Sequence, residues 1–599
     1  MELLTLDGVI EKGVFEIPSY QRGYAWQKGQ LEDFWNDLEY VSKLGDKFHY
    51  MHSLTLRELE NEFENSTFEI IDGQQRLATS LILLGLLAKI TKHKDPKYDS
   101  MNLEPILSYK YYGLSEAFRA IMEEEKDLER FQTSFYAKNL IDAYAFFKEK
   151  ISDTPVGTLE KMFDALIKKM LFSVVELNDN RIDPFSSFET INSRGKDLST
   201  LELFKNRLHF VAHKICDEKE DLENLQQEIN DTYTRIYHDL RFFKDDHLRD
   251  FLKHFVAYYY GEKRDFKERL LNTAFDAHKK YDDLYDEYEK INDLLLHLSY
   301  SSKVWYFLHT LDDEELRIEI TPKMRGLLDK MRRLNALSEN AFLPLLLSLL
   351  TIQLVGRSAN EQPYTTQELE GLLEYLERFG FLIYGVADGK NTAKNEWIGL
   401  AFKAIQACRF WGDKITIEDL PTLEKSFFNR QGNSALELLE ESIHSKKNTE
   451  KWYQWGKALN YLLYEYELYH NPETTLNFDG SIESIEHILP QKPDQGYSAK
   501  EKSWAKNPHI VHALGNLLLI AKNANSSLSN KPFEEKRKQY LKGSYSEKEV
   551  AKNASFGIVE IQKRSEKLLD FLIARYRIAE LVGESAIKAF KNALLKDIK

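Results

Sequence analysis

The kind of secondary structure that the sequence favours changes twice along the chain, and this limits the possible folds. Up to about residue 210, short β-rich runs alternate with helical patterns, which indicates mixed α and β structure. The helical period then dominates to about residue 430, and a segment rich in Gly, Asn and Pro precedes a helical tail after that. We therefore predict an α+β, predominantly helical protein with three domains: 1–210, 211–430 and 431–599.

Length and composition agree with several globular domains. The 599 residues exceed the roughly 100–200 residues of one domain, and a composition of 43% hydrophobic and 30% charged residues excludes disordered and collagen-like classes. The two cysteines, Cys216 and Cys408, form no CxxC pair, which excludes a thiolate zinc site and favours a reducing compartment.

We expect a cytoplasmic protein that does not enter a membrane. The first residues lack the pattern of a signal peptide. The most apolar stretch, 341–355, is shorter than the ~20 residues that span a bilayer, so it predicts a buried helix.

The net charge of −15 argues against indiscriminate coating of nucleic acid. The segment 481–545 is different, because it has ten Lys or Arg and six Asp or Glu. Such a positive segment is suited to contact DNA phosphates, although a chance fluctuation gives the same count.

Three short motifs distinguish the first 210 residues. The first, 17–26 (IPSYQRGYAW), combines aromatic rings with an arginine fork that can bind phosphate; the alternative is an aromatic loop that fills the core. The second, Asp72-Gly73-Gln74-Gln75-Arg76, joins a predicted strand to a predicted helix. Gly73 permits a tight turn, and the helix start with Arg76 offers donors to a phosphate; here the alternative is a purely structural turn.

The third motif, 188–199 (FETINSRGKDLS), has a strong structural interpretation. Gly195 is suited to end a helix, and Ser199 with Glu202 predicts a capping box for the next one. Asn192 and Lys205 are nevertheless candidates to reach a nucleotide.

These motifs, in this order, resemble the N-terminal domain of the GmrSD family of type IV restriction enzymes, which is similar to the ParB/sulfiredoxin fold. The resemblance implies binding and hydrolysis of a nucleoside triphosphate, with no preference among ATP, GTP, CTP and UTP. The implied nucleotide-binding residues are Asp72, Gly73, Gln74, Gln75, Arg76, Asn192 and Lys205. The implied sensing residues are Tyr20, Gln21, Arg22 and Trp26. Many members carry Asp at the position of Glu202, a departure that keeps the charge.

A second set of chemically suited residues lies in 485–537. A histidine with an ordinary pKa near 6.5 can take a proton from water, and carboxylate and amide oxygens suit Mg²⁺. A bound cation would stabilise the departing oxygen, and a nearby lysine would hold the phosphate. The candidates are Glu486, His487, Asn516, Asn525, Asn530, Lys531 and Lys536.

This segment resembles the HNH, or ββα-metal, nucleases and the C-terminal domain of the same family. The resemblance implies His487 as general base and Asn516 as the residue that orients its ring. It implies Glu486 and Asn525 as ligands of Mg²⁺ or Mn²⁺, Asn530 as the fallback ligand, and Lys531 or Lys536 as phosphate contacts. Glu486 in place of Asp and a long interval before Asn516 depart from the pattern. His509 and His512 are interpreted as surface residues or neighbours of the site.

We therefore predict a modification-sensing, NTP-hydrolysing DNA endonuclease of antiphage defence, which nicks or cuts modified phage or host DNA and can form a homo-oligomer. The helices between the two domains would transmit the nucleotide state to the nuclease, or hold the nuclease inactive until modified DNA is sensed. Two alternatives stay open: a nucleotide-switched DNA-binding scaffold with an inactive nuclease segment, and an RNA-cleaving toxin.

Overall fold

The computed structural model describes residues 2–18, 21, 23–59, 66–110, 113–177, 199–262, 265–276, 279–281, 283–314, 316–356, 363–387, 389, 391–410, 412–423, 426, 452–474, 476, 483–493, 496–595 and 598. The chain separates into two compact units, Met1–Phe307 and Leu308–Lys599. The predicted boundaries at 210 and 430 stay predictions.

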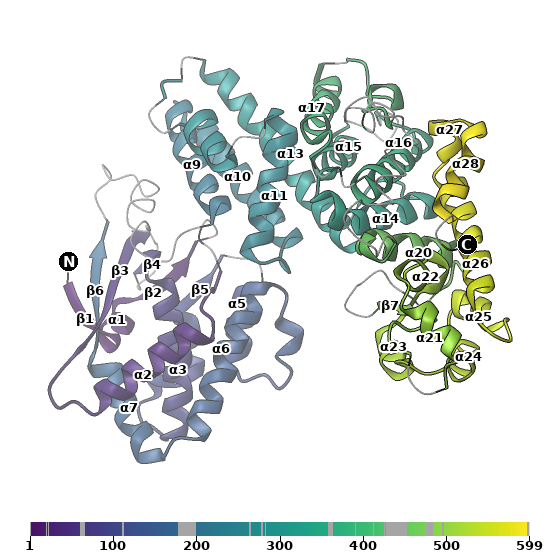
Figure 1. Ribbon diagram of the computed structural model, residues 1–599. Helices are drawn as coiled ribbons and strands as arrows, with labels where there is room; N and C mark the ends of the chain where they lie inside the picture. The colour runs from purple at the N-terminus through teal and green to yellow at the C-terminus, as the bar shows by residue number, and fades with distance from the viewer. Residues whose placement is uncertain are drawn as a thin grey trace. The chain divides into compact units, whose positions relative to one another are not determined.

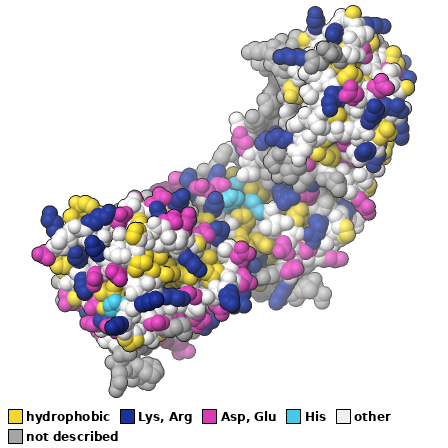
Figure 2. All heavy atoms as spheres, turned by 90° about the horizontal axis from the view of Figure 1, so that it is seen from below, with side chains coloured by type: hydrophobic (Ala, Val, Ile, Leu, Met, Phe, Trp, Pro, Cys, Tyr) yellow, Lys and Arg dark blue, Asp and Glu magenta, His cyan; other side chains and the backbone are white. Residues whose placement is uncertain are grey.

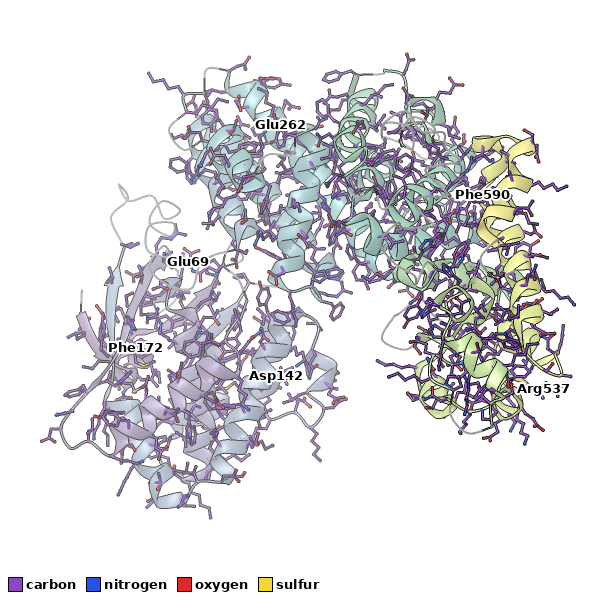
Figure 3. All side chains as sticks on the ribbon, viewed as in Figure 1. Glu69, Asp142, Phe172, Glu262, Arg537 and Phe590 are labelled. Carbon is purple, nitrogen blue, oxygen red and sulfur yellow. The ribbon has the colours of Figure 1, made fainter. Side chains whose placement is uncertain are left out.

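A mixed six-stranded sheet organises the N-terminal unit, in the order β1-β6-β3-β4-β2-β5 (Figure 1). The β1–β6 and β3–β4 pairs are antiparallel and the other three pairs are parallel. The strands are β1 (Glu2–Thr5), β2 (Val14–Ile17), β3 (His49–Leu59), β4 (Thr67–Asp72), β5 (Leu107–Tyr109) and β6 (Met170–Glu176). Strands β2, β3, β4 and β6 coincide with the β-rich runs of the sequence at 15–18, 48–56, 67–72 and 171–178. Strands β1 and β5 were not predicted. Glu69 on β4, labelled in Figure 3, pairs with Arg57 on the adjacent β3 at 2.5 Å.

Among the described residues, seven helices accompany the sheet. They are α1 (Leu6–Lys12), α2 (Lys28–Ser42), α3 (Gln74–Ile90), α4 (Ser100–Leu103), α5 (Leu114–Met122), α6 (Phe135–Ser152) and α7 (Val156–Lys168). Helix α3 contacts α6 and α7, and 14 of its 17 residues are buried. It is apolar on all sides, as expected of a helix that other elements surround.

The rest of the N-terminal unit is helical, as predicted. It contains α9 (Thr200–Ile215), α10 (Lys219–Asp239), α11 (Asp245–Tyr260), α12 (Phe266–Glu268) and α13 (Leu284–Thr310), the last of which extends into the second unit. The capping box predicted before α9 is confirmed: the Ser199 amide donates to Glu202 Oε2 at 2.6 Å, and the Glu202 amide donates to Ser199 Oγ at 3.3 Å.

The C-terminal unit is a helical assembly with a small two-stranded sheet. Its longer helices are α14 (Pro322–Ser338), α15 (Leu343–Val355), α16 (Thr366–Phe379), α17 (Lys394–Phe410), α20 (Lys457–His470) and α26 (Ile558–Arg575). Its shorter ones are α21 (Ala499–Ala505), α22 (Pro508–Val511), α23 (Lys522–Leu528), α24 (Phe533–Tyr540), α25 (Tyr545–Ala551), α27 (Ile578–Val582) and α28 (Glu584–Leu595). The predicted buried helix is α15, and no helix in the described part of the chain is long and apolar enough to cross a membrane.

A buried charge network joins α14, α16, α20 and α26 within the C-terminal unit. Arg575 Nη2 lies 2.9 Å from Glu377 Oε1 and 3.0 Å from Glu465 Oε2. Lys330 Nζ lies 2.7 Å from Glu465 Oε2, and the Tyr461 hydroxyl donates to Glu377 Oε1 at 2.8 Å. Because both carboxylates are only 1–2% exposed, each depends on its cation to offset the cost of burial.

Figure 2 shows that acidic and basic side chains are interspersed over the face in view. The net charge of −15 is therefore distributed, and it forms no continuous acidic field on that face.

Candidate active site

The segment with the candidate nuclease residues forms a strand, a second strand and then a helix. Strand β7 (Glu483–His487) pairs antiparallel with β8 (Leu517–Ala521), so that His487 lies opposite Leu517, and α23 follows β8 directly. The order of elements agrees with the prediction. The assignment to the HNH fold stays a prediction.

His487 ends β7 inside a small cluster of rings. Its side chain is buried, and its Nε2 lies 3.1 Å from Nδ1 of His512. The side-chain nitrogen Nε2 of Gln491 lies 3.3 Å from Nδ1 of His487. The Tyr453 ring lies 4.8 Å from the His487 ring and stacks on His512 at 5.4 Å between centroids. Both ring nitrogens of His487 therefore have a polar neighbour.

The environment of His487 keeps its ring neutral. Burial, with smaller contributions from the charges of His512 and Lys536, lowers the pKa of His487 to about 3. A neutral imidazole retains the lone pair that a general base uses, but a pKa of about 3 makes it a weak base as long as the ring stays buried.

Two residues of this cluster were not predicted as functional. Of the two interpretations given to His512, the structure agrees with a neighbour of the site and not with a surface residue, because His512 is 6% exposed and contacts His487 directly. The available signal was the position of His512 shortly before strand β8 (Leu517–Ala521). Tyr453 precedes the segment and carried no signal, because only the fold brings it to the two histidines.

The side chain of Asn516 binds main-chain groups, and its predicted role in orienting the His487 ring stays a prediction. Its Oδ1 accepts from the Leu489 amide at 2.7 Å. Its Nδ2 donates to the Leu489 carbonyl at 2.9 Å and to the Val511 carbonyl at 2.7 Å. Since the amide has one oxygen and two N–H donors, these three bonds engage both donors and the oxygen.

Glu486 and Lys536 contact each other, so neither has the predicted environment. Successive side chains of a strand point to opposite faces, and Glu486 therefore lies on the other face of β7 from His487. Lys536 Nζ donates to Glu486 Oε1, and the Tyr540 hydroxyl donates to the same oxygen at 3.1 Å. With an exposed fraction of 0%, Lys536 cannot reach a phosphate from this position. Burial raises the pKa of Glu486 and lowers the pKa of Lys536.

The remaining candidates lie around α23. The Asn525 amide nitrogen donates to Ser484 Oγ at 2.7 Å and to the Ile485 carbonyl at 3.1 Å, which fastens α23 to β7. Asn530 is half-buried, and Lys531 is exposed in the turn before α24. Of the two candidate lysines, Lys531 is therefore the one that a phosphate can reach.

Two of the predicted metal ligands, Glu486 and Asn525, have protein partners in this arrangement. Across the described ranges, no group of three or more His, Cys, Asp or Glu side chains is placed to hold a metal ion. The Glu486 carboxylate already binds the Lys536 ammonium. Dependence on Mg²⁺ or Mn²⁺ therefore stays a prediction from the resemblance.

In the N-terminal unit, the predicted strand–turn–helix junction is confirmed. Gly73 lies between β4 and α3 with a φ of +103°, a conformation that favours glycine. A Cβ at this position would lie 2.9 Å from Leu54 Cδ1 and 3.0 Å from the Ser53 carbonyl oxygen. The turn therefore requires glycine both for its backbone angle and for the space beside β3.

Asp72 and Arg76 form a partly exposed pair at the start of α3. Arg76 Nη2 lies 3.2 Å from Asp72 Oδ2, and Nη1 donates to the Met51 carbonyl at 2.9 Å. Their side chains are 23% and 19% exposed. A guanidinium beside the amino end of a helix is suited to bind an anion.

Gln75 and Gln21 instead hold the aromatic segment against the sheet. Gln75 Oε1 accepts from the Ala25 amide at 2.8 Å, and Gln75 Nε2 donates to the Gly23 carbonyl at 3.1 Å. Gln21 Nε2 donates to the Ile71 carbonyl at 3.0 Å. Both glutamine side chains are buried, and these contacts give them a structural role. Their predicted nucleotide and sensing roles stay predictions.

The other predicted N-terminal residues are placed as follows. Gln74 is buried, and the half-buried Trp26 lies 6.0 Å from Phe34 between ring centroids. Three residues lie outside the described part of the chain: Tyr20, Arg22 and Asn192.

Lys205 is fully buried on α9. Its Nζ lies 5.4 Å from the centre of the Tyr233 ring and has no hydrogen-bond partner among the described residues. Burial lowers the pKa of Lys205 to about 7. Its predicted contact with a nucleotide stays a prediction.

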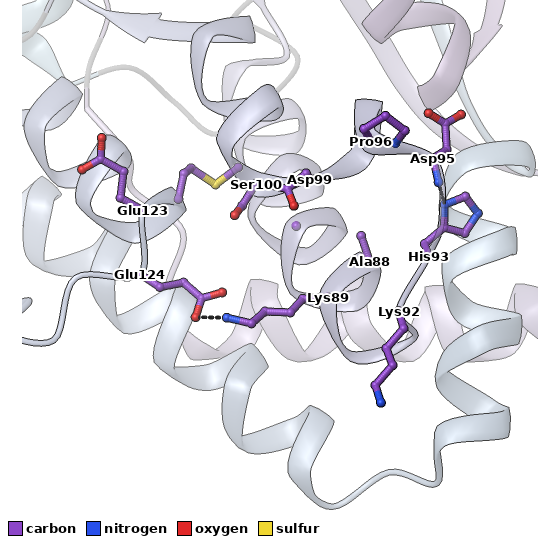
Figure 4. A pocket seen from close by; sticks show the side chains of 12 residues that line it. Ala88, Lys89, Lys92, His93, Asp95, Pro96, Asp99, Ser100, Glu123 and Glu124 are labelled. Atoms are coloured by element: carbon purple, nitrogen blue, oxygen red, sulfur yellow. Dashed lines mark hydrogen bonds and ion pairs between the residues drawn. The ribbon is translucent and has the colours of Figure 1, made fainter.

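A cavity of about 500 Å³ lies at the carboxyl end of α3 (Figure 4). Its lining mixes both charges, and Lys89 pairs with Glu124. At 1.5 Å per helical residue, the cavity lies roughly 18 Å along the helix from Arg76. It is therefore separate from the predicted nucleotide site.

Comparison with known families assigns both ends of the chain. Residues 4–209 match the N-terminal domain of the GmrSD restriction endonucleases, and residues 439–571 match their C-terminal domain. No match is found among curated proteins. The two domain matches cover more than half of the chain, in the order expected from the motifs. The chain therefore belongs to the GmrSD family of type IV restriction endonucleases.

Proposed function

We propose that this restriction endonuclease cleaves DNA with water activated by His487, after its N-terminal domain has sensed modified DNA and hydrolysed a nucleoside triphosphate. The observation that carries the proposal is the position of His487: a neutral imidazole at the end of β7, in a family of DNA-cleaving enzymes.

The reaction requires three actions of the protein. The His487 ring takes a proton from water while the water oxygen bonds to phosphorus and the bond from phosphorus to the leaving oxygen breaks. One ring nitrogen must exchange its present neighbour for that water. The exposed Lys531 would contact a phosphate, and the backbone bonds of Asn516 hold Leu489, two residues after His487.

A cleavage assay on plasmid DNA tests the nuclease. Unmodified, glucosylated-hydroxymethylcytosine and phosphorothioate DNA are incubated with Mg²⁺ or Mn²⁺, with and without nucleotide, and an RNA of similar length serves as the alternative substrate. We expect His487→Ala to abolish cleavage with nucleotide hydrolysis largely intact, and the control His509→Ala to cleave normally. Full cleavage by folded His487→Ala refutes the assignment. Cleavage of RNA alone favours the toxin alternative.

Arg76 tests the nucleotide site. We expect Arg76→Ala to weaken nucleotide binding at least tenfold in calorimetric titrations with ATP, GTP, CTP and UTP, because the partly exposed guanidinium is lost from the start of α3. Arg130→Ala is the matched control, since Arg130 is exposed in the same unit. Unchanged affinity of Arg76→Ala contradicts the proposal. Nucleotide binding without any cleavage favours the scaffold alternative.

A further inference from the structure

We propose that Lys536 and Glu486 act as one positioning device for His487: Lys536 holds the main chain of the base, and Glu486 neutralises Lys536. This assigns neither residue to substrate or metal. The inference rests on the proposed role of His487 as the general base.

The contacts of the Lys536 ammonium carry the proposal. Besides Glu486 Oε1, Nζ donates to the His487 carbonyl at 2.9 Å and to the Ile488 carbonyl at 3.3 Å. An ammonium group has three N–H donors, so these three oxygens match its full capacity. Two of them belong to the main chain of the base and of the next residue.

The buried positive charge of Lys536 explains why the Glu486 carboxylate lies beside it. Lys536 is 0% exposed and Glu486 is 4% exposed, and an isolated charge at this depth would be costly. The carboxylate offsets the ammonium, and the Tyr540 hydroxyl provides a further donor to it. The Glu486 carboxylate is therefore bound to Lys536, on the face of β7 opposite to His487.

Asn516 extends the same support by one residue. Lys536 binds the carbonyl groups of residues 487 and 488, and Asn516 binds both the amide and the carbonyl of Leu489. Three consecutive residues are therefore fixed from two sides. Because a misplacement of about 1 Å can cost about 100-fold in rate, this support bears directly on the base.

The alternative roles conflict with the geometry. A phosphate contact would require Lys536 to leave a site where it is fully buried. A metal ion bound to Glu486 would have to displace the ammonium, which would then be left buried without its counter-charge.

A double-mutant cycle tests the device in the full chain. The variants are Lys536→Met, Glu486→Gln and the double variant, with Lys538→Met, an exposed lysine of the same helix α24, as control. We expect each single variant to lower kcat on DNA about 10- to 100-fold, with KM changed less than about 3-fold. Each single variant should lower the temperature of thermal unfolding. The double variant should lower it by less than the sum of the two single effects, because no unpaired charge then stays buried.

Binding of Mn²⁺, followed by electron paramagnetic resonance, separates positioning from ligation. We expect Glu486→Gln to bind Mn²⁺ as wild type does. A tenfold loss of Mn²⁺ affinity with an unchanged thermal transition would identify Glu486 as a ligand and overturn the proposal. A rise in KM alone for Lys536→Met would identify a phosphate contact and do the same.

The nuclease proposal and the pairing of Lys536 with Glu486 are tested by different measurements, so one can fail while the other holds. If wild-type protein cleaves no nucleic acid, the nuclease proposal fails, whereas the thermal coupling between residues 486 and 536 still decides whether they act as a pair. Additive thermal losses in the cycle would refute the pairing whatever the activity.

Discussion

Gly515 is the position in the nuclease segment where a single added carbon should have the largest effect. It lies in a short 3₁₀ turn (Leu514–Asn516) that contacts α26. A Cβ at this position would lie 2.0 Å from the Ile561 carbonyl oxygen and 2.7 Å from the Ser565 amide nitrogen. Both are backbone atoms, so no rotation of a side chain can relieve the overlap.

The size of the effect follows from these distances. Non-bonded heavy atoms stay about 3 Å or more apart, so α26 must move by roughly 1 Å. Such a shift strains the bond from the Gly515 amide to Ser565 Oγ at 2.8 Å and the bond from Arg564 Nη1 to the Gly515 carbonyl at 2.9 Å. With about 1–3 kcal/mol for overpacking and about 0.5–1.5 kcal/mol for each of the two weakened bonds, Gly515→Ala should cost about 2–6 kcal/mol.

Thermal unfolding followed by circular dichroism and calorimetry measures this cost. At about 2–4 °C per kcal/mol for a unit of this size, the transition of the C-terminal unit should fall by roughly 10 °C. The control is Gly399→Ala in α17, where an added Cβ meets nothing within 4 Å, and where alanine should stabilise the helix by about 0.5–1 kcal/mol. A Gly515→Ala protein as stable as wild type would refute the reasoning.

Three further predictions concern other sites. The pKa of Lys205 is about 7 in the folded protein and near 10.4 in an unfolded chain, so the unfolded state binds more protons between these values. The free energy of unfolding should therefore rise by a few kcal/mol from pH 7 to 10, and urea titrations of Lys205→Met should lack this rise; equal slopes for both proteins would contradict it. Ser199→Ala removes the cap of α9 and should lower the free energy of unfolding by about 1 kcal/mol in the same titrations, whereas an unchanged midpoint would show that the cap contributes nothing. A chelator should stop DNA cleavage and added Mg²⁺ or Mn²⁺ should restore it; cleavage that continues in the chelator would exclude the predicted cofactors.

Local patterns were sufficient to predict the central part of the N-terminal sheet. The run 67–72, Gly73 and the apolar helix after it are contiguous, so the junction was visible in the sequence. Strand β5 has only three residues, too few to show a period of two, and the four residues of β1 (ELLT) do not alternate between polar and apolar. Their place in the sheet depends on partners that are distant in the sequence.

The residues of the candidate active site could likewise be predicted only where the signal is local in the sequence. His487 and the strand that carries it were predicted from local sequence, but Tyr453 and His512 reach it only through the fold. The contact between Glu486 and Lys536 was not predicted, for another reason. Neighbours in the sequence were taken as neighbours in space, although the alternation of side chains along a strand separates them. Lys536 and Asn516 were correctly included in the segment, but their partners are backbone groups that no side-chain pattern reveals.

The buried charge network of the C-terminal unit has a consequence for how this protein can be dissected. A fragment that begins at residue 431, the predicted domain boundary, would retain Glu465 and Arg575 but lose Lys330 and Glu377. It would also uncover the surface that α14 and α16 shield. We expect such a fragment to aggregate on expression, and a fragment that begins near Leu308 to be the shortest one that carries the nuclease segment in a stable form.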